Sequence, residues 1–363
     1  MPLEVSARLD REKAIYLAGE TIQVTVTIKN ISTKGKQVEQ LAWGSVQFAC
    51  ERTMGASTSS SIRQRPTTAM TRSASTVYSS PPNIMFCELK LAPGQEKKFI
   101  CDIHLSRNLI PPTYRGFHIK YSSRLTIAVS HIQSHINLRH IQIRIIPSVG
   151  LETKLSLPSN PFLASTMTRP TIVETVMATV DELTMSRKSQ AFALTHATSK
   201  VALLTLPKKA YRLGEDVCAY LDFSDSNTPC IQYSATIETE EKIIDAHVGE
   251  ETNKKTSVKV HDQTAPVCTF SPDSTFRLSI PLTAVPTFST DSVQLKWRIR
   301  FIFVVTDQPY KLRVENGVPV SSAPIDVPVE SFSWSTEILV LPCKPQNVAL
   351  LDHSFPNNTS LTV

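Results

Sequence analysis

Alternation of apolar and polar residues is the main pattern in both halves of the chain. Residues 21–28 alternate strictly, with Ile or Val at every even position and Thr or Gln at every odd one. Residues 293–303 alternate as well, with apolar side chains at odd positions and mainly Gln, Lys or Arg between them. A period of two is typical of a strand with one buried and one solvated face. It favours antiparallel sheets, because strands of a parallel sheet are usually buried on both faces.

Similar apolar segments recur along the chain and are separated by turn residues such as Pro93-Gly94 and Pro111-Pro112. Strands are expected at 21–28, 41–50, 85–91, 99–105, 117–129 and 141–146, and then at 217–223, 231–237, 276–280, 293–305 and 332–341. Neither half contains a dependable helical pattern. About seven short strands per half predict an all-β protein built from two tandem antiparallel β-sandwich domains.

The two halves also repeat one another. The segment Tyr16–Glu20 corresponds to Tyr211–Glu215 (211 − 16 = 195), and Ile143–Pro147 corresponds to Ile338–Pro342 at the same interval (338 − 143 = 195). A period of that length is too great for a solenoid repeat and fits a whole domain. The predicted organisation is two copies of one β-domain at 1–148 and 198–345, a linker at 149–197 and a flexible tail at 346–363.

Two segments depart from the strand pattern. Residues 52–80 are rich in Ser and Thr, with four arginines and no acid, and such a composition predicts a disordered loop. In the linker, residues 171–174 (Thr-Ile-Val-Glu) have the form of a helix capping box. One helical face after this box carries Val173, Val176, Met177 and Val180. A short helix is expected there, and it requires a surface on which to dock.

Composition narrows the class of protein. The chain has 363 residues, of which 41% are hydrophobic and 19% charged, as in soluble globular proteins. We expect no membrane helix, because no apolar run approaches about 20 residues, and no signal peptide, because an apolar h-region is lacking.

Seven cysteines without a CxxC motif predict reduced, mostly buried thiols in a cytoplasmic protein. The net charge of +6 favours an acidic partner or an anionic membrane, and no basic stripe with interleaved aromatics indicates nucleic-acid binding.

Motifs for catalysis or metal binding are absent from the sequence. It contains no phosphate-binding glycine motif and no GxSxG motif. His131 and His135 have HxxxH spacing, but their apolar neighbours predict strand and turn, so surface histidines are the better interpretation. Cys87 and Cys101 are interpreted as buried structural thiols rather than a redox pair. We therefore expect no enzyme, no cofactor and no bound metal.

The linker holds the residues that we predict to bind a partner. Residues 160–163 (Asn-Pro-Phe-Leu) place two large apolar side chains in a polar segment. Phe162 either packs on its own domain or anchors in the groove of a partner. The predicted partner-binding residues are Phe162, Leu163, Val173, Val176, Met177 and Val180.

Several blocks of the sequence resemble known families. The segment Pro111–Gly116, followed by 119–121 and 125–127, resembles the proline–aromatic–glycine motif that leads into a strand of the arrestin-like family. That family has two β-sandwiches in tandem. The blocks at 82–89, 161–163, 211–217, 295–298 and 327–334 resemble, in order, the Rgp family of retrograde Golgi transport proteins.

The Rgp resemblance implies a role that composition does not give. Members of that family pair with a much larger Ric-type subunit, and the complex is a guanine-nucleotide exchange factor for a Golgi Rab GTPase of the Rab-six class. The implied function is a non-catalytic interaction subunit in retrograde endosome-to-Golgi and intra-Golgi transport, cytoplasmic and peripheral on the Golgi membrane.

The alternative is an arrestin-type cargo or ubiquitin-ligase adaptor. Such adaptors usually carry PPxY motifs in a C-terminal tail. Residues 343–363 have none, and the PPxY match at 111–114 lies at a predicted strand start.

Overall fold

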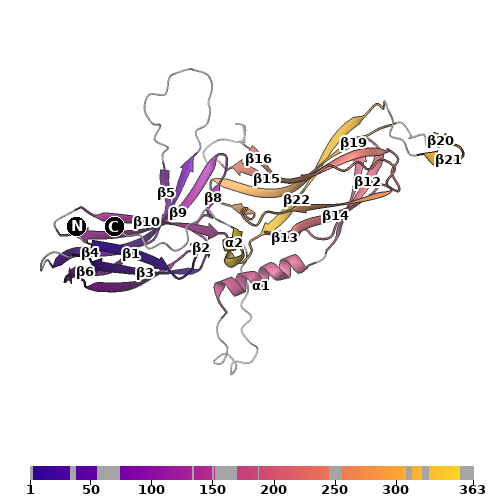
Figure 1. Ribbon diagram of the computed structural model, residues 1–363. Helices are drawn as coiled ribbons and strands as arrows, with labels where there is room; N and C mark the ends of the chain where they lie inside the picture. Colours follow the sequence, from indigo (N-terminus) through magenta and orange to yellow (C-terminus); the bar gives the residue numbers. More distant parts are fainter. Residues whose placement is uncertain are drawn as a thin grey trace, which may run out of the picture. The chain divides into compact units, whose positions relative to one another are not determined.

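The fold is almost entirely β-structure in a computed structural model (Figure 1). The structure describes residues 3–32, 38–54, 74–132, 135–148, 151, 170–186, 188–244, 256–307, 313–320 and 327–351. The chain divides into two compact units, Met1–Met177 with Lys344–Val363, and Ala178–Cys343. The all-β, two-domain sandwich fold predicted from the sequence is therefore confirmed.

The first unit contains two sheets. The smaller has the order β1 (Leu3–Leu9), β3 (Thr21–Asn30), β7 (Glu96–His104). The larger has the order β2 (Ile15–Leu17), β10 (Asn137–Ile146), β9 (Ile119–His131), β4 (Glu39–Met54), β5 (Ala74–Ser79), with β6 (Asn83–Leu91) beside β4 and β8 (Tyr114–Arg115) beside β9. The described pairs are antiparallel except β2 with β10, which is parallel.

The second unit repeats this plan. Its smaller sheet has the order β11 (Gln190–His196), β12 (Ser199–Leu206), β14 (Asp216–Asp222), β17 (Asp273–Ser279). The larger has the order β13 (Ala210–Arg212), β22 (Glu330–Leu341), β19 (Val293–Val305), β15 (Cys230–Ile243), β16 (Thr256–Thr264), with β18 (Phe288–Ser289) beside β19. A separate hairpin joins β20 (Arg313–Glu315) to β21 (Val318–Val320). Here β13 and β22 form the parallel pair.

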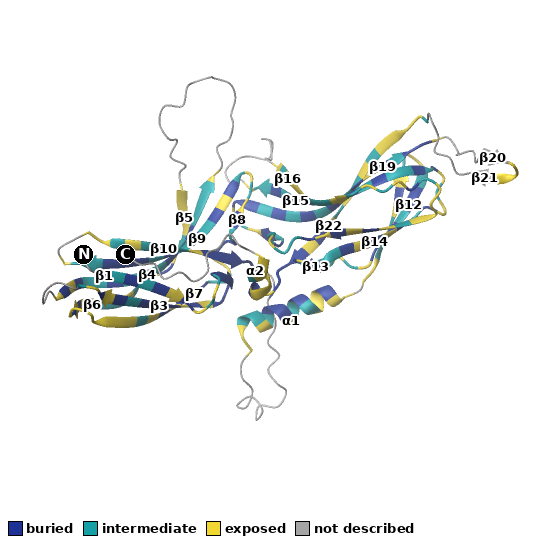
Figure 2. Cartoon of the chain, in the orientation of Figure 1, coloured by how far each residue is buried: buried dark blue, intermediate teal, exposed yellow. Residues whose placement is uncertain are grey.

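The alternation of the sequence becomes the inner and outer faces of these sheets (Figure 2). The even positions of 22–28 in β3 are fully buried. In β19 the odd positions are buried, and Phe301 stacks on Phe303 with ring centroids 5.8 Å apart. Trp297 is also buried, and its indole N–H donates to the Val285 carbonyl at 3.0 Å. Each large apolar side chain buried in this way stabilises the fold by about 1.5–3 kcal/mol.

The 195-residue repeat is preserved in three dimensions. Gly19 and Gly214 both adopt left-handed backbone conformations, with φ of +99° and +83°. Each follows the short strand that pairs in parallel, β2 or β13, and precedes an inner strand of the smaller sheet, β3 or β14. The turn is closed in each unit by a backbone hydrogen bond of 3.1 Å, from Glu20 to Leu17 and from Glu215 to Arg212. The left-handed conformation explains the glycine at both positions.

The turn of the first unit is held by a carboxylate. One oxygen of Glu20 accepts a hydrogen bond from the Leu17 N–H at 2.6 Å. The Arg11 guanidinium pairs with the same carboxylate and lies over the Tyr16 ring, 4.6 Å from its centroid. The buried glutamate thus satisfies both a backbone donor and a charged partner.

The turn of the second unit uses the same arrangement with a lysine. Glu215 accepts from the Arg212 N–H at 3.0 Å and pairs with the Lys208 ammonium at 2.8 Å. That ammonium lies 4.9 Å from the centroid of the Tyr211 ring. Burial works to raise the pKa of Glu215, but the hydrogen bonds from Lys208 and Arg212 outweigh it and lower that pKa.

Part of the segment expected to be a disordered loop is regular strand. β4 continues to Met54, and β5 pairs with it, so residues 52–54 and 74–79 belong to a sheet. Residues 55–73 lie outside the described residues. Composition was misleading at the two ends of the segment 52–80, because main-chain hydrogen bonds can hold a strand whose side chains stay exposed. Most side chains of β5 are exposed in this way.

The second sandwich also begins earlier than predicted, and the expected tail contains a helix. β11 lies inside the segment taken as linker and pairs with β12. The helix α2 (Pro345–Leu351) buries Pro345 and Val348, and the Lys13 ammonium donates to the Ala349 carbonyl. Seven residues of helix are too few for a clear periodic signal, so tertiary contact rather than pattern decides this element.

We predict that Gly214→Ala destabilises the second unit by about 1–2 kcal/mol, the cost of a left-handed conformation for a residue with a Cβ. The new Cβ would also lie 2.8 Å from Leu282 Cδ1, which must move. Chemical unfolding of the full chain measures the effect. Gly317→Ala is the control for the clash: Gly317 has φ +80° but open space around it, so this variant carries the left-handed cost alone and should destabilise the chain less. Unchanged stability of the Gly214 variant would contradict the role of this turn.

We also predict a pH dependence centred on His261. Burial, and secondarily Lys259, lower its pKa from 6.5 to about 4, while the ring stacks on Trp297 at 4.5 Å. The unfolded chain therefore takes up the proton first as the pH falls. The stability that the neutral ring confers, about 1–3 kcal/mol after allowance for partial exposure, should be lost between about pH 6.5 and 4. Unfolding curves of the wild type and His261→Gln, measured across this range, should differ in slope; equal slopes would refute the assignment.

Candidate partner-binding site

The linker forms the helix α1 (Ile172–Met185), which starts with the predicted capping box. The Thr171 N–H donates to Glu174 Oε2 at 2.8 Å, and the Glu174 N–H donates to Thr171 Oγ1 at 3.2 Å. The hydrogen bonds with Thr171 lower the pKa of Glu174. Both exposed N–H groups at the start of the helix are thereby satisfied.

The helical face predicted to bind a partner is largely covered by the chain itself. Val176 and Val180 are fully buried, Met177 is 6% exposed, and Val173 is partly exposed. A fully buried side chain cannot touch another protein unless the helix moves, so three of these residues do not form an open contact surface. The docking surface that the helix required is thus supplied within the chain. Phe162 and Leu163 lie outside the described residues, and their role stays a prediction.

The exposed side of α1 offers other apolar residues. Leu183 is 41% and Met185 71% exposed near the end of the helix. Asp181 forms an ion pair with Arg212 at 2.5 Å, which joins this part of α1 to the Gly214 turn of the second unit. Sequence reasoning missed both exposed residues because it followed the helical face with the more regular apolar spacing. In an amphipathic helix that face usually packs against the protein core.

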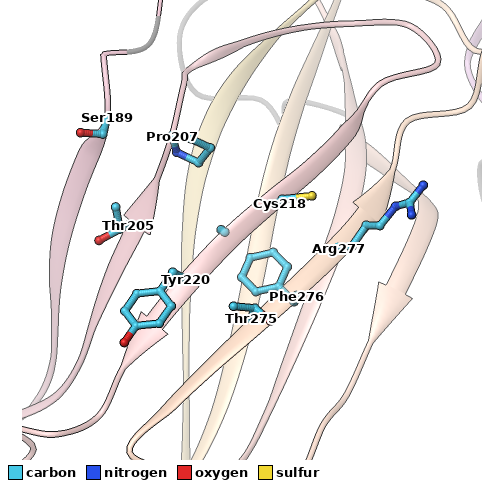
Figure 3. A pocket seen from close by; sticks show the side chains of 9 residues that line it. Ser189, Thr205, Pro207, Cys218, Tyr220, Thr275, Phe276 and Arg277 are labelled. Carbon is cyan, nitrogen blue, oxygen red and sulfur yellow. The ribbon is translucent and has the colours of Figure 1, made fainter.

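A shallow groove lies on the outer face of the smaller sheet of the second unit (Figure 3). Its volume is about 590 Å³. Its lining residues are Ser189, Thr205, Pro207, Cys218, Ala219, Tyr220, Thr275, Phe276 and Arg277. Cys218 and Tyr220 stand on neighbouring outward positions of β14, and each faces a β17 residue, Arg277 or Thr275, in register.

The lining of the groove combines apolar side chains with hydroxyl groups, one thiol and one guanidinium. None of its lining residues is a histidine or a carboxylate that could serve as general base for the Cys218 thiol. At one end Arg277 pairs with Asp216 at 2.5 Å. At the other, the Tyr220 hydroxyl donates to Asp273 at 3.3 Å. Arg277 and Tyr220, at the two ends of the groove, therefore have partners within the sheet.

The two histidines with HxxxH spacing have different surroundings. His131 contacts Glu39 across neighbouring strands at 2.8 Å, whereas His135 is exposed. Nearby, His140 contacts Thr126 at 3.0 Å. In the described parts of the chain, no group of three or more His, Cys, Asp or Glu side chains could hold a metal ion. No helix in those parts is long and apolar enough to span a membrane.

The cysteines are mostly buried, as predicted, but Cys87 differs from its individual prediction. All seven are free thiols, but Cys87 and Cys218 are exposed. Cys87 was interpreted as buried; instead it lies on an outward-facing position of β6, while Cys101 is buried. Burial raises the pKa of the Cys101 thiol. The sequence could not settle this, because an apolar run does not show which residues of a strand face outward.

Comparison with known proteins identifies the family. The Rgp1 family model matches residues 7–189 and 159–306, so the chain belongs to the Rgp1 family. It is 29% identical to the human protein named RAB6A-GEF complex partner protein 2, over 99% of each chain. It is also 29% identical to the bovine protein of that name, over 95% of this chain and 94% of the relative. The sporulation control protein Spo0M of Bacillus subtilis aligns with 63% of this chain and 77% of its own at 13% identity, but a TM-score of 0.30 bears no conclusion.

We predict that Val176→Ala and Val180→Ala each destabilise the chain by about 1–3 kcal/mol, because each removes two methyl groups from a buried position. The control is the double variant Leu183→Ala with Met185→Ala, whose exposed side chains should change stability by less than about 0.5 kcal/mol. Thermal unfolding measures both. If the valine variants kept full stability and lost a partner instead, this face would be a contact surface.

Proposed function

We propose that this chain is the smaller, non-catalytic interaction subunit of a guanine-nucleotide exchange complex that acts on a Rab GTPase. The observation that carries the proposal is the match over 99% of both chains to a relative whose name describes it as a partner protein of a RAB6A exchange complex. A match of that extent includes both sandwich units, so the two proteins share their whole organisation rather than a single module.

The physical argument agrees with a subunit that binds rather than catalyses. Nucleotide exchange requires an element that disturbs the phosphate and magnesium contacts of the nucleotide. Two helices are described in this chain. α1 has its regular apolar face buried, and α2 has only seven residues. Neither presents a helical wedge for a GTPase, so we assign the exchange element to another subunit.

The finer assignment follows the Rgp resemblance. We propose a large Ric-type subunit as the stoichiometric partner and a Golgi Rab GTPase of the Rab-six class as the target, in retrograde endosome-to-Golgi and intra-Golgi transport. We place the complex in the cytoplasm, peripheral on the Golgi membrane. The net charge of +6 supports contact with an anionic surface.

The sheets offer a mode of contact for the GTPase. β5 pairs with β4 and is the last strand in the order of the larger sheet of the first unit. Most side chains of β5 are exposed. An extended segment can add to such an edge through main-chain hydrogen bonds with little demand on its sequence. We propose that the flexible C-terminal segment of a Rab binds at an edge of this kind.

The adaptor alternative has less support. A PPxY motif must be accessible to be read by another domain. In the one match, Pro111 and Pro112 are buried and Tyr114 is only 8% exposed. The segment serves instead as the start of β8, so we prefer the exchange-complex subunit.

The proposal is tested by purifying the tagged chain from its source cells and by measuring nucleotide release. We predict one stoichiometric partner much larger than this chain, a complex that accelerates release from a Golgi Rab, and no acceleration by this chain alone at the same concentration. Nucleotide release from an unrelated Rab is the control. Robust exchange by the isolated chain, or recovery without a large partner, would refute the proposal.

A further inference from the structure

A second motif is repeated in the two units, where the chain enters the larger sheet. In the first unit the Thr113 N–H donates to the Ile145 carbonyl at 2.9 Å, and the Ile145 N–H donates to Thr113 Oγ1 at 2.9 Å. In the second, Thr287 and Val340 exchange the same two bonds, at 2.9 and 3.1 Å. Each threonine stands between a proline and an aromatic residue. The two segments are therefore structural equivalents.

The hairpins that follow have the same length and register. Tyr114 pairs with Tyr121 as Phe288 pairs with Leu295. In the first unit the turn is closed by the Gly116 N–H and the Ile119 carbonyl at 2.9 Å. The second unit has the same bond, from Thr290 to Val293, at the same distance. Two sequences thus form one backbone shape, and their differences at the tip are not required by the turn.

The tips differ in chemistry. The first-unit tip, residues 115–120, reads Arg-Gly-Phe-His-Ile-Lys, and its second-unit equivalent, 289–294, reads Ser-Thr-Asp-Ser-Val-Gln. Phe117 therefore takes the place of Asp291. It is 79% exposed, the highest value among the large apolar side chains that the structure describes. Since Asp291 supports the same turn, the fold gives no reason to expose an aromatic ring there.

The Phe117 tip is basic and is anchored by buried neighbours. Ile119 and Tyr121, which follow it in β9, are buried. Arg115 and Lys120 are exposed and lie opposite each other across the hairpin, just behind the tip. Neither forms an ion pair with a carboxylate in the described parts of the chain. Their equivalents in the second unit are the uncharged Ser289 and Gln294.

We propose that the β8–β9 hairpin tip inserts Phe117 into an anionic membrane while Arg115 and Lys120 bind lipid phosphates. The inference rests on the membrane association in the proposed function and assigns residues to it. An aromatic ring is favoured at the boundary of headgroups and acyl chains, and cations behind it are favoured at the phosphates. Phe117 lies at the turn and Arg115 and Lys120 lie behind it, so the ring would reach deeper into the membrane than the two cations.

A lipid surface fits better than a protein pocket. The feature is one exposed ring at the turn of a hairpin with two exposed cations just behind it, and a bilayer accepts a ring of this kind without a complementary cavity. One ring and two cations give weak, reversible binding, so the tip would act together with other contacts of the complex. Weak membrane binding fits a subunit that associates reversibly with a membrane rather than one that is anchored in it.

The test is sedimentation of the full-length chain with vesicles of phosphatidylcholine, with or without phosphatidylserine. The wild type should bind the phosphatidylserine vesicles more strongly. Phe117→Asp, which installs the residue of the second unit, should weaken that binding about tenfold. Arg115→Ser with Lys120→Gln, again the second-unit residues, should weaken it about tenfold and remove the preference for phosphatidylserine.

Matched controls separate the tip from general properties of the surface. Ile100→Ala removes another apolar side chain of the first unit, 68% exposed, and Lys90→Ser with Lys97→Gln removes two other exposed cations. Neither control should change binding by more than about twofold. Phe117→Trp should retain binding, and brominated acyl chains should quench the fluorescence of this variant more than that of the wild type.

The outcomes decide the proposal. Three results would each overturn it. The first is no binding of the wild type to phosphatidylserine vesicles, and the second is an equal loss of binding in the tip and control variants. The third is quenching by brominated lipid that is no greater in the Phe117→Trp variant than in the wild type. If Phe117→Asp instead lost the large partner and kept vesicle binding, the tip would be a protein contact. Failure of vesicle binding alongside normal complex formation and exchange would remove this inference and leave the proposed function intact.

Discussion

The tight left-handed turn at Gly19, and its equivalent at Gly214, is the constraint on which each sandwich depends. In both units it carries the chain from a short parallel strand of the larger sheet to an inner strand of the smaller sheet, β3 or β14. Glu20 or Glu215 then fixes the turn through a backbone N–H and a cation that lies over a tyrosine ring. Because the turn connects the two sheets directly, it positions the inner strand of the smaller sheet against the larger sheet, and side chains of the two inner faces fill the core between them.

The internal duplication provides a comparison within one molecule. Features that both units share, such as the glutamate turn and the threonine that begins the hairpin, are explained by the fold. Features present in one unit need another explanation. Phe117 with its flanking cations is of this second kind, because the equivalent positions of the second unit hold Asp291, Ser289 and Gln294. A repeated scaffold can thus carry different surface chemistry in its two copies.

The polar groups described above are engaged in contacts within each unit. His131 contacts Glu39 and His140 contacts Thr126 on adjacent strands, and the carboxylates of both turns are paired with cations. A subunit of this kind contributes area, position and affinity to a complex. Membership of the Rgp1 family supplies the biological setting in which such contributions are needed.

The sequence by itself determined the all-β class, the duplication and the capping box, because each depends on local periodicity or on residues at a fixed spacing. The alternation in 21–28 and 293–303 directly specified which side chains enter the core. Tertiary structure alone decided that β5 pairs within a Ser- and Thr-rich segment, that α2 forms, and that Val176 and Val180 are buried. It also decided that Phe117 is exposed and Cys87 faces outward. Those outcomes depend on neighbours distant along the chain, and an apolar side chain carries no local signal of whether its neighbour is its own core or solvent.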